Sequence, residues 1–218
     1  MSVKEPSRFI PALSFDWLTP AYDTVVRYTT REKVFKSALL HQMAPQAGER
    51  ILDLGCGTGT LAVMIKSREP RAEVIGFDAD ARILERARRK ARENQVDIVF
   101  NEGLSNQLPY ADATFDCVVS SLFFHHLLPH NKLSTLKEVK RILRKNGRLR
   151  VADWSTATNH LMKLLSRSIS LLDGVETTRD SFEGKLRKYI NDGGFKNVSE
   201  VDTFNTIFGT IRLINASR

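Results

Sequence analysis

The stretch ILDLGCGTGT (residues 51–60) decides the fold, because an apolar run leads directly into three glycines at alternate positions. Glycine lacks the Cβ that would hold the backbone away from a ligand, and it allows positive φ in a tight turn. The stretch therefore predicts a buried strand, a loop that approaches a ligand, and a helix that begins at Thr60. Asp53 precedes the first glycine by two residues, so a carboxylate is expected beside the turn.

Outward from this stretch, short apolar runs alternate with amphipathic ones, a pattern typical of βαβ units that build a parallel sheet. The expected strands are Arg50–Leu54, Glu73–Phe77, Ile98–Asn101, Phe115–Ser120 and Arg148–Ala152. The expected helices between them are Thr60–Ser67, Ala81–Asn94 with Asp80 as its cap, and Lys132–Leu143, which Asn146 and Gly147 are expected to end.

Further elements are expected on both sides of this core. Before it, one helix is expected from Pro20 to about Tyr28, and a second from Arg31 to about Met43. After it come the expected helices Thr158–Leu172 and Phe182–Asn191 and two strands within Val198–Asn215. The predicted fold is α/β: a doubly wound, mostly parallel seven-stranded sheet with helices on both faces and a C-terminal antiparallel hairpin.

No linker or low-complexity tract divides the 218 residues, so we expect a single domain. Its expected parts are a helical cap over the cofactor site (residues 1–45), a cofactor-binding core (46–156), and helices with a closing hairpin (157–218). No apolar run approaches the length of a membrane span, and the N-terminus lacks the features of a signal peptide. The expected location is the cytoplasm, and peripheral contact with a membrane is an alternative.

The spacing of the glycines discriminates between cofactors. The second strand ends at Asp78, which is expected to grip the hydroxyls of a ribose. Dinucleotide-binding loops read G-x-G-x-x-G and place a pyrophosphate at the helix start, whereas this loop reads G-x-G-x-G. The carboxylate of Asp53 would repel a pyrophosphate but suits the ammonium end of an amino acid. These features favour S-adenosylmethionine over NAD.

These motifs, together with Leu108-Pro109-Tyr110 and the run FDCVV (residues 115–119), resemble those of class I S-adenosylmethionine-dependent methyltransferases. Within that superfamily the chain is similar to the ubiquinone/menaquinone-biosynthesis and phospholipid N-methyltransferase branches. The resemblance implies S-adenosyl-L-methionine as cofactor and S-adenosyl-L-homocysteine as product. It implies the cofactor-binding residues Tyr22, Asp53, Gly55, Cys56, Gly57, Thr58, Gly59, Asp78, Ala79, Ile83, Leu104, Ser105 and Ser120. Leu104 departs from the family pattern, because relatives commonly have an acid or amide there that accepts from the adenine amino group, and Ser105 is expected to substitute in part.

Residues that follow the fourth and fifth strands are expected to face the methyl acceptor, since ligands bind at the carboxyl edge of such sheets. The expected substrate pocket consists of Ser121, Phe123, Phe124, Asp153 and Trp154; alternatively, Trp154 only anchors the core. His125 or His126 could act as a base toward a hydroxyl or an activated ring carbon; alternatively, one of them caps the next helix or hydrogen-bonds a loop. No metal is expected, because Pro129 interrupts the helix that His126 and His130 would need to share as ligands.

The predicted function is methyl transfer to a small or lipid-like acceptor of quinone or phospholipid type. The chain has 33 Lys and Arg against 25 Asp and Glu, which gives a net charge of +8. Because a positive charge attracts anions, methylation of RNA or protein is one alternative function, and an anionic membrane is a candidate peripheral partner. Nucleic acid is the less favoured partner, because no aromatic residues accompany the basic runs. A second alternative is a regulatory protein that binds the cofactor without turnover.

Overall fold

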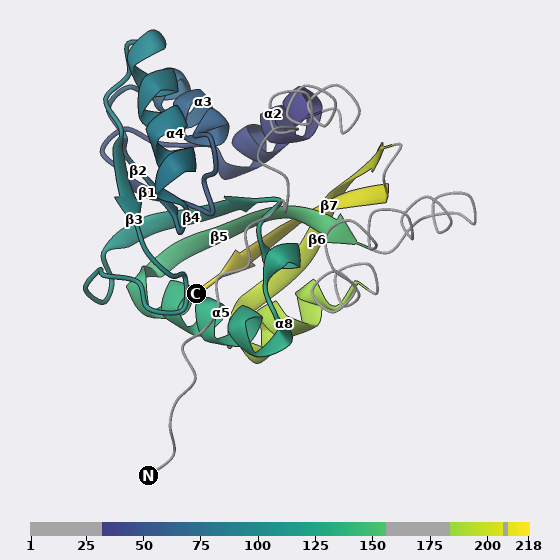
Figure 1. Cartoon of the computed structure of the whole chain (residues 1–218). Coiled ribbons are helices and arrows are strands. Elements are labelled where there is room, and N and C mark those ends of the chain that lie inside the picture. The colour runs from purple at the N-terminus through teal and green to yellow at the C-terminus, as the bar shows by residue number, and fades with distance from the viewer. Residues whose placement is uncertain (1–31, 156–183, 207–208) are drawn as a thin grey trace.

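The protein contains a seven-stranded sheet with the strand order β3-β2-β1-β4-β5-β7-β6 (Figure 1). The computed structural model describes residues 32–155, 184–206 and 209–218. Its strands are β1 (Arg50–Leu54), β2 (Glu73–Asp78), β3 (Val99–Glu102), β4 (Phe115–Ser121), β5 (Leu143–Ser155), β6 (Lys196–Thr206) and β7 (Gly209–Ser217). The first five strands pair in parallel, whereas β7 runs antiparallel to both β5 and β6.

Helices cover both faces of this sheet. One face carries α2 (Glu32–Met43), α3 (Thr60–Arg68) and α4 (Ala81–Glu93), and the other carries α5 (Pro129–Ile142) and α8 (Leu186–Asp192). Each face has its own hydrophobic core, since side chains alternate between the faces along each strand: Ile51 packs under the first helix layer and Leu52 under the second. A short 3₁₀ helix, η1 (Phe124–His126), follows β4.

The strand order reverses direction at β1, which is where doubly wound sheets bind their ligands. From β1 the chain proceeds outward through β2 and β3, and it then returns to the other side of β1 to form β4. The loops that leave β1 and β4 therefore diverge in opposite directions, so a ligand is expected at the carboxyl edge of these two strands.

Most of the expected elements are confirmed, including the parallel strands and the C-terminal hairpin about Gly209. Asp80 caps α4 as expected, because its side chain accepts from the backbone N–H groups of Arg82 and Ile83. α8 begins at Leu186 rather than Phe182 and ends before Gly193.

The expected helix Lys132–Leu143 was wrong at both ends. It begins at Pro129, because proline is tolerated in the first helical turn, where its missing N–H has no intrahelical acceptor. It ends at Ile142, since buried Leu143 already pairs with Phe115 of β4. Asn146 and Gly147 therefore lie within an irregular start of β5 instead of ending the helix, and a Cβ at Gly147 would lie 2.8 Å from the carbonyl oxygen of Arg144.

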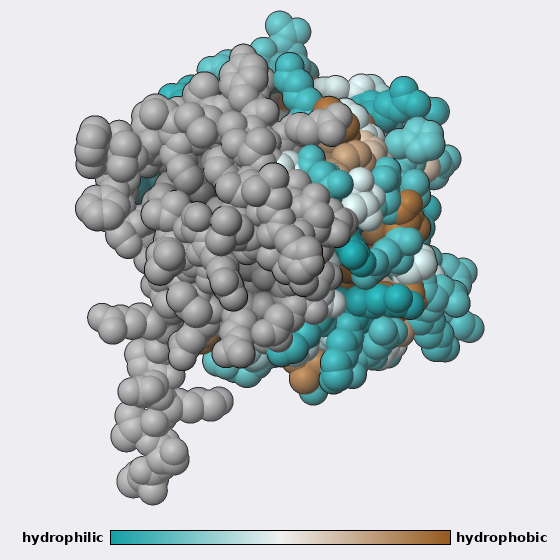
Figure 2. Space-filling view, turned by 90° about the vertical axis from the view of Figure 1, so that its right-hand side faces the viewer, coloured by the Kyte–Doolittle hydropathy of each residue, from teal (hydrophilic) through white to brown (hydrophobic). Residues whose placement is uncertain are grey.

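Several expectations fall outside the described residues, namely the helices Pro20–Tyr28 and Thr158–Leu172. Among the residues that the structure does describe, no helix is both long enough and apolar enough to cross a membrane. On the face drawn in Figure 2, the coloured part of the surface is mainly hydrophilic, with small separate hydrophobic areas.

Candidate functional site

The glycine loop is anchored to the end of β2 by its backbone. The N–H groups of Gly55 and Cys56 donate to the carbonyl oxygen of Phe77 at 2.8 and 3.1 Å, and the N–H of Gly59 donates to the carbonyl of Cys56 at 2.9 Å. Gly55, Gly57 and Gly59 all have positive φ, between 51° and 73°. The loop conformation is therefore one that L-residues rarely adopt, as the glycine spacing predicted.

The three glycines have different surroundings. A Cβ at Gly55 would lie 2.3 Å from the ring of Phe123, and a Cβ at Gly59 would lie 2.9 Å from Ala87 on α4. At Gly57, by contrast, a Cβ would meet no atom within 4 Å. Gly55 and Gly59 are thus required by packing, while Gly57 borders open space that a ligand could occupy.

Asp78 stands at the end of β2 and connects the glycine loop with the start of α4. Its Oδ2 accepts from the N–H of Gly57 at 2.9 Å, and its Oδ1 accepts from the N–H of Asp80 at 3.1 Å. Burial raises the pKa of Asp78, and these backbone donors partly oppose that effect. The carboxylate thus lies beside the open space at Gly57, where its remaining lone pairs can accept from hydroxyl groups.

Asp53 is a buried carboxylate with unmet hydrogen-bonding capacity. Its side chain is 1 % exposed, and its Oδ2 has no hydrogen-bond partner. Burial raises its pKa to about 7, although the positive charge of Lys36 on α2 and the N–H of Ala62 act in the opposite direction. Ser121, at the end of β4, likewise has a buried hydroxyl without a partner. Because Asp53 pairs with Val119 and side chains alternate, Asp53 and Ser121 point to the same face of the sheet.

These observations fit S-adenosylmethionine. The buried carboxylate of Asp53 can receive an ammonium group, the carboxylate of Asp78 can receive ribose hydroxyls, and the open space at Gly57 admits a ligand close to the backbone. A pyrophosphate would have to lie near the two carboxylates, which electrostatic repulsion disfavours.

The neighbouring residues of the glycine loop support its shape. The ammonium of Lys90 donates to the hydroxyls of Thr58 and Thr60 at 2.9 and 2.6 Å. Cys56 is buried, and burial raises the pKa of its thiol, which therefore stays neutral. Both observations indicate that Lys90, Thr58, Thr60 and Cys56 have a structural role in the loop.

The loop after β3 carries the expected adenine contacts and is tied to α5. Leu104 is 39 % exposed, and the hydroxyl of Ser105 hydrogen-bonds that of Thr135 at 2.8 Å. The guanidinium of Arg141 donates to the carbonyl oxygens of Leu108 and Tyr110 at 3.0 and 2.7 Å.

Glu138 completes this attachment, because its Oε2 accepts from the N–H of Leu108 at 3.0 Å while both of its carboxylate oxygens bind Arg141. α5 therefore holds the loop through three side chains: Thr135, Glu138 and Arg141. Ala79 and Ile83, the other expected adenine neighbours, are half-buried at the start of α4.

Ser120 and Phe124, two of the expected site residues, have no exposed surface. Ser120 is fully buried, and its hydroxyl donates to the carbonyl of Leu54 at 2.9 Å, which links β4 to β1. Phe124 is also fully buried in the core on the α5 side, whereas the half-buried ring of Phe123 contacts Gly55. Tyr22 lies outside the described residues.

The acceptor side of the site contains a buried histidine–aspartate pair. Nδ1 of His125 lies 2.7 Å from Oδ1 of Asp153, and the two side chains are 4 % and 1 % exposed. The N–H of Trp154 also donates to Oδ1 of Asp153 at 2.7 Å. Burial alone would raise the pKa of Asp153, but its contact with His125 and the hydrogen bond from the N–H of Trp154 hold that pKa below its usual range.

An ionised Asp153 can only accept hydrogen bonds, so Nδ1 of His125 carries the proton. In the neutral ring this leaves Nε2 with a free lone pair. The centroid of the Trp154 ring lies 6.5 Å from that of His125 in an edge-on arrangement, and the centroid of the His126 ring lies 3.9 Å from that of His125. His126 belongs to η1 and His130 to α5, so the two do not share one helix.

Sequence reasoning missed two features of this site. Lys36 acts electrostatically on Asp53 but precedes it by 17 positions, and only its i,i+4 ion pair with Glu32 is visible locally. The attachment of the 103–112 loop to α5 was also missed, because Arg141 is 31 positions from Tyr110 and 33 from Leu108, whose carbonyl oxygens it binds. Neither contact has a sequence signal of its own.

Comparison with known proteins agrees with this geometry. Residues 51–147 match the family model described as "Methyltransferase domain". The demethylmenaquinone methyltransferase of Deinococcus radiodurans is 33% identical over 137 residues, which cover 62% of this chain and 56% of that protein. The ubiquinone/menaquinone biosynthesis C-methyltransferase UbiE of Syntrophotalea carbinolica is 31% identical over 158 residues, covering 72% and 66%. The chain thus spans between about half and two thirds of the length of these relatives.

Solved structures show the same fold. The YcgJ protein of Bacillus subtilis superposes with a TM-score of 0.71 at 19% identity, covering 84% of this chain and 97% of that one. The putative methyltransferase in complex with the Trm112 activator of Haloferax volcanii gives a TM-score of 0.72 at 20% identity, covering 92% and 95%.

Proposed function

Because residues 51–147 form a methyltransferase domain of the class I, S-adenosylmethionine-dependent family, we propose that this protein methylates a small molecule whose acceptor is a hydroxyl or an activated ring carbon. The names of the curated relatives support a quinone-type acceptor. The observation that carries the proposal is the buried pair of His125 and Asp153 at the carboxyl edge of β4 and β5.

The cofactor would be held by residues of the glycine loop and the two neighbouring strands. Asp53 would receive its ammonium group, Gly57 would allow its close approach, and Asp78 would accept from the ribose hydroxyls. When bound, S-adenosylmethionine supplies an electrophilic methyl group on a sulfonium and leaves as S-adenosylhomocysteine. Positioning an acceptor in line with that group can contribute roughly 7–11 kcal/mol of barrier reduction.

The role of His125 follows from its tautomer. Asp153 accepts a hydrogen bond from the Nδ1–H group, so Nε2 is the basic atom. Nε2 takes a proton from the methyl acceptor while the oxygen or carbon of that acceptor forms the new bond to the methyl carbon. Asp153 orients the imidazole and stabilises the imidazolium that results. The proton then passes from His125 to solvent. The positive charge of the sulfonium is lost when the methyl group leaves it, and the released proton carries the equivalent charge away.

A quinol-type acceptor suits this arrangement. Ring hydroxyls and their activated carbons lose a proton during methylation and gain from a positioned base. The half-buried ring of Phe123 would provide a flat apolar surface for such a ring, whereas Trp154 is 6 % exposed and packs in the hydrophobic core.

The test is methyl transfer from isotope-labelled S-adenosylmethionine to a panel of acceptors: a demethylated naphthoquinol, a catechol, phosphatidylethanolamine vesicles, RNA and an unrelated protein. We expect labelled product and S-adenosylhomocysteine only with the hydroxylated aromatic acceptors. Transfer to RNA, protein or the phospholipid amine would reject the proposed acceptor class. Cofactor binding without transfer to any acceptor would instead favour a regulatory protein.

A further inference from the structure

A basic groove lies at the edge of the sheet opposite the glycine loop. It has a volume of about 590 Å³ and is lined by Lys140, Lys145, Asn146, Lys196, Asn197, Ser217 and Arg218. Lys145 and Asn146 lie at the amino end of β5, and Ser217 ends antiparallel β7 beside Arg148. The cofactor residues stand at the carboxyl edge of the parallel strands, so the groove is separate from the methyl-transfer site.

The side chains of the groove carry four positive charges, and no aspartate or glutamate lines it. Among the described residues, Lys145 and Lys196 have neither an ion-pair nor a side-chain hydrogen-bond partner, and the ammonium of Lys140 donates to the carbonyl oxygen of Gly194 at 2.6 Å. Positive charges gathered in a concavity reinforce one another's field and attract anions.

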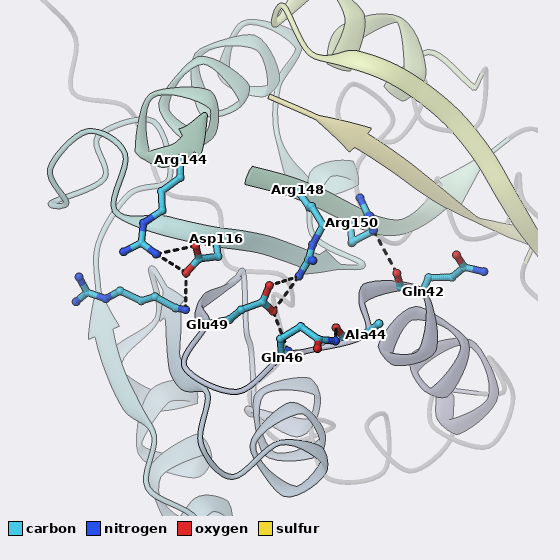
Figure 3. Close-up of polar contacts among 9 residues, drawn as sticks. Gln42, Ala44, Gln46, Glu49, Asp116, Arg144, Arg148 and Arg150 are labelled. Carbon is cyan, nitrogen blue, oxygen red and sulfur yellow. Dashed lines mark hydrogen bonds and ion pairs between the residues drawn. The ribbon is translucent and has the colours of Figure 1, made fainter. Parts of the chain in front are cut away.

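Two arginines at this edge, Arg144 and Arg148, are paired with carboxylates, as Figure 3 shows. Arg144 donates to both carboxylate oxygens of Asp116 at 2.6 and 2.7 Å, and Arg148 donates to both of Glu49 at 2.7 and 2.8 Å. Lys145 and Lys196 of the groove differ from these two arginines, because neither lysine has an acidic partner within the described part of the chain.

We propose that this groove binds a small, soluble anion with several phosphate groups. Its volume lies within the range of about 300–1,000 Å³ that small-ligand sites occupy. The lysines would neutralise the phosphate oxygens, while the amides of Asn146 and Asn197 and the hydroxyl of Ser217 supply further hydrogen-bond donors.

The lining favours this ligand over macromolecules. No aromatic side chain lines the groove, so bases of a nucleic acid would have no stacking surface. The large hydrophobic residues that are exposed in the described part of the chain are Val34, Val99, Leu104 and Val201, and none of them borders the groove. An apolar contact to insert into a membrane is therefore lacking among the lining residues.

The experiment is calorimetric titration of the full chain with inorganic tripolyphosphate at about 0.15 M salt, where weak surface attraction is screened. The test variant is Lys145→Ala/Lys196→Ala. The matched control is Lys33→Ala/Arg92→Ala, which removes two exposed charges from helices α2 and α4 on the other face of the sheet. We expect the dissociation constant of tripolyphosphate to rise at least about ten-fold in the test variant and to stay unchanged in the control.

Titration of both variants with S-adenosylmethionine shows whether they are folded, since that ligand binds at the opposite edge. Absence of tripolyphosphate binding to the wild type, or equal weakening in both variants, would overturn the proposal. Parallel titrations use a single-stranded oligonucleotide and anionic vesicles of phosphatidylglycerol. A third contrary result is that the oligonucleotide or the vesicles bind more tightly than tripolyphosphate and lose that binding in the test variant alone. Either case would overturn the proposal in favour of a nucleic acid or a membrane.

Discussion

Nδ1 of His125 and Oδ1 of Asp153 lie 2.7 Å apart although 28 positions separate them in the chain, and both side chains are almost wholly buried. A buried carboxylate in contact with a histidine fixes which ring nitrogen carries the proton. This contact makes the acceptor side of the site testable without knowledge of the substrate.

Asp153→Asn should lower the rate of methyl transfer by about 10²–10⁴-fold, because the amide can no longer hold His125 in the tautomer with a basic Nε2. The affinity for S-adenosylmethionine should stay within a few-fold of wild type. Steady-state kinetics across pH and calorimetry measure the two effects. Asp97→Asn, at an exposed aspartate after α4, serves as the control. A rate unchanged in Asp153→Asn at every pH would remove the pair from the mechanism.

The affinity for S-adenosylmethionine should rise roughly ten-fold between pH 5.5 and 7, because Asp53 has a pKa of about 7 and only its ionised form attracts the ammonium group. The α-amino group of the ligand stays protonated over this range. Asp53→Asn should bind weakly and lose this pH dependence. Equilibrium dialysis at several pH values checks both; an equally steep profile in the variant would assign it to another group.

The stability of the ligand-free protein should show the opposite trend. The folded chain keeps a proton on Asp53 that the unfolded chain releases near pH 3.8, so the free energy of unfolding falls as pH rises from about 4 to 7. At pH 8, Asp53→Asn should therefore be more stable than wild type, by up to about 4 kcal/mol. Urea unfolding at pH 5 and pH 8 measures the difference. If Asp53→Asn were less stable than wild type at pH 8, the buried charge of Asp53 would not destabilise the folded protein as expected.

Gly57→Ala and Gly55→Ala should separate ligand contact from packing. Both place alanine at positive φ, which costs about 1 kcal/mol, but only Gly55→Ala also clashes with Phe123. Gly55→Ala should thus lose more thermal stability, whereas Gly57→Ala should lose more cofactor affinity relative to its stability. Thermal unfolding and calorimetry of the two variants provide the comparison. Full cofactor affinity in Gly57→Ala would exclude that position from the binding surface.

Arg141→Met should raise the dissociation constant of S-adenosylmethionine several-fold, because the loop that carries Leu104 and Ser105 loses its attachment to α5. Loss of this hydrogen-bonded charge should also cost about 1–3 kcal/mol of stability. Arg144→Met, which removes an arginine paired with Asp116, is the matched control and should leave cofactor affinity unchanged. Equal effects on affinity in the two variants would refute a specific role of Arg141.

Local patterns predicted most of the core. The start of β1, the cap at Asp80 and the glycine loop follow from spacing within a few residues, because backbone sterics and hydrogen bonds act over that range. The expectation that Asn146 and Gly147 end a helix failed for the same reason: the local signal is real, but pairing of Leu143 with Phe115 overrides it.

By itself the sequence determined the type of sheet, the ligand loop with its two carboxylates, and the family resemblance, since each is encoded by short-range periodicity or by a contiguous motif. Only the tertiary structure decided which distant side chains meet: Asp153 with His125, Lys36 near Asp53, and Arg141 on the carbonyls of Leu108 and Tyr110. Such contacts depend on strand order and on how helices pack across the sheet. Both are set by the burial of the whole core, which no single segment specifies.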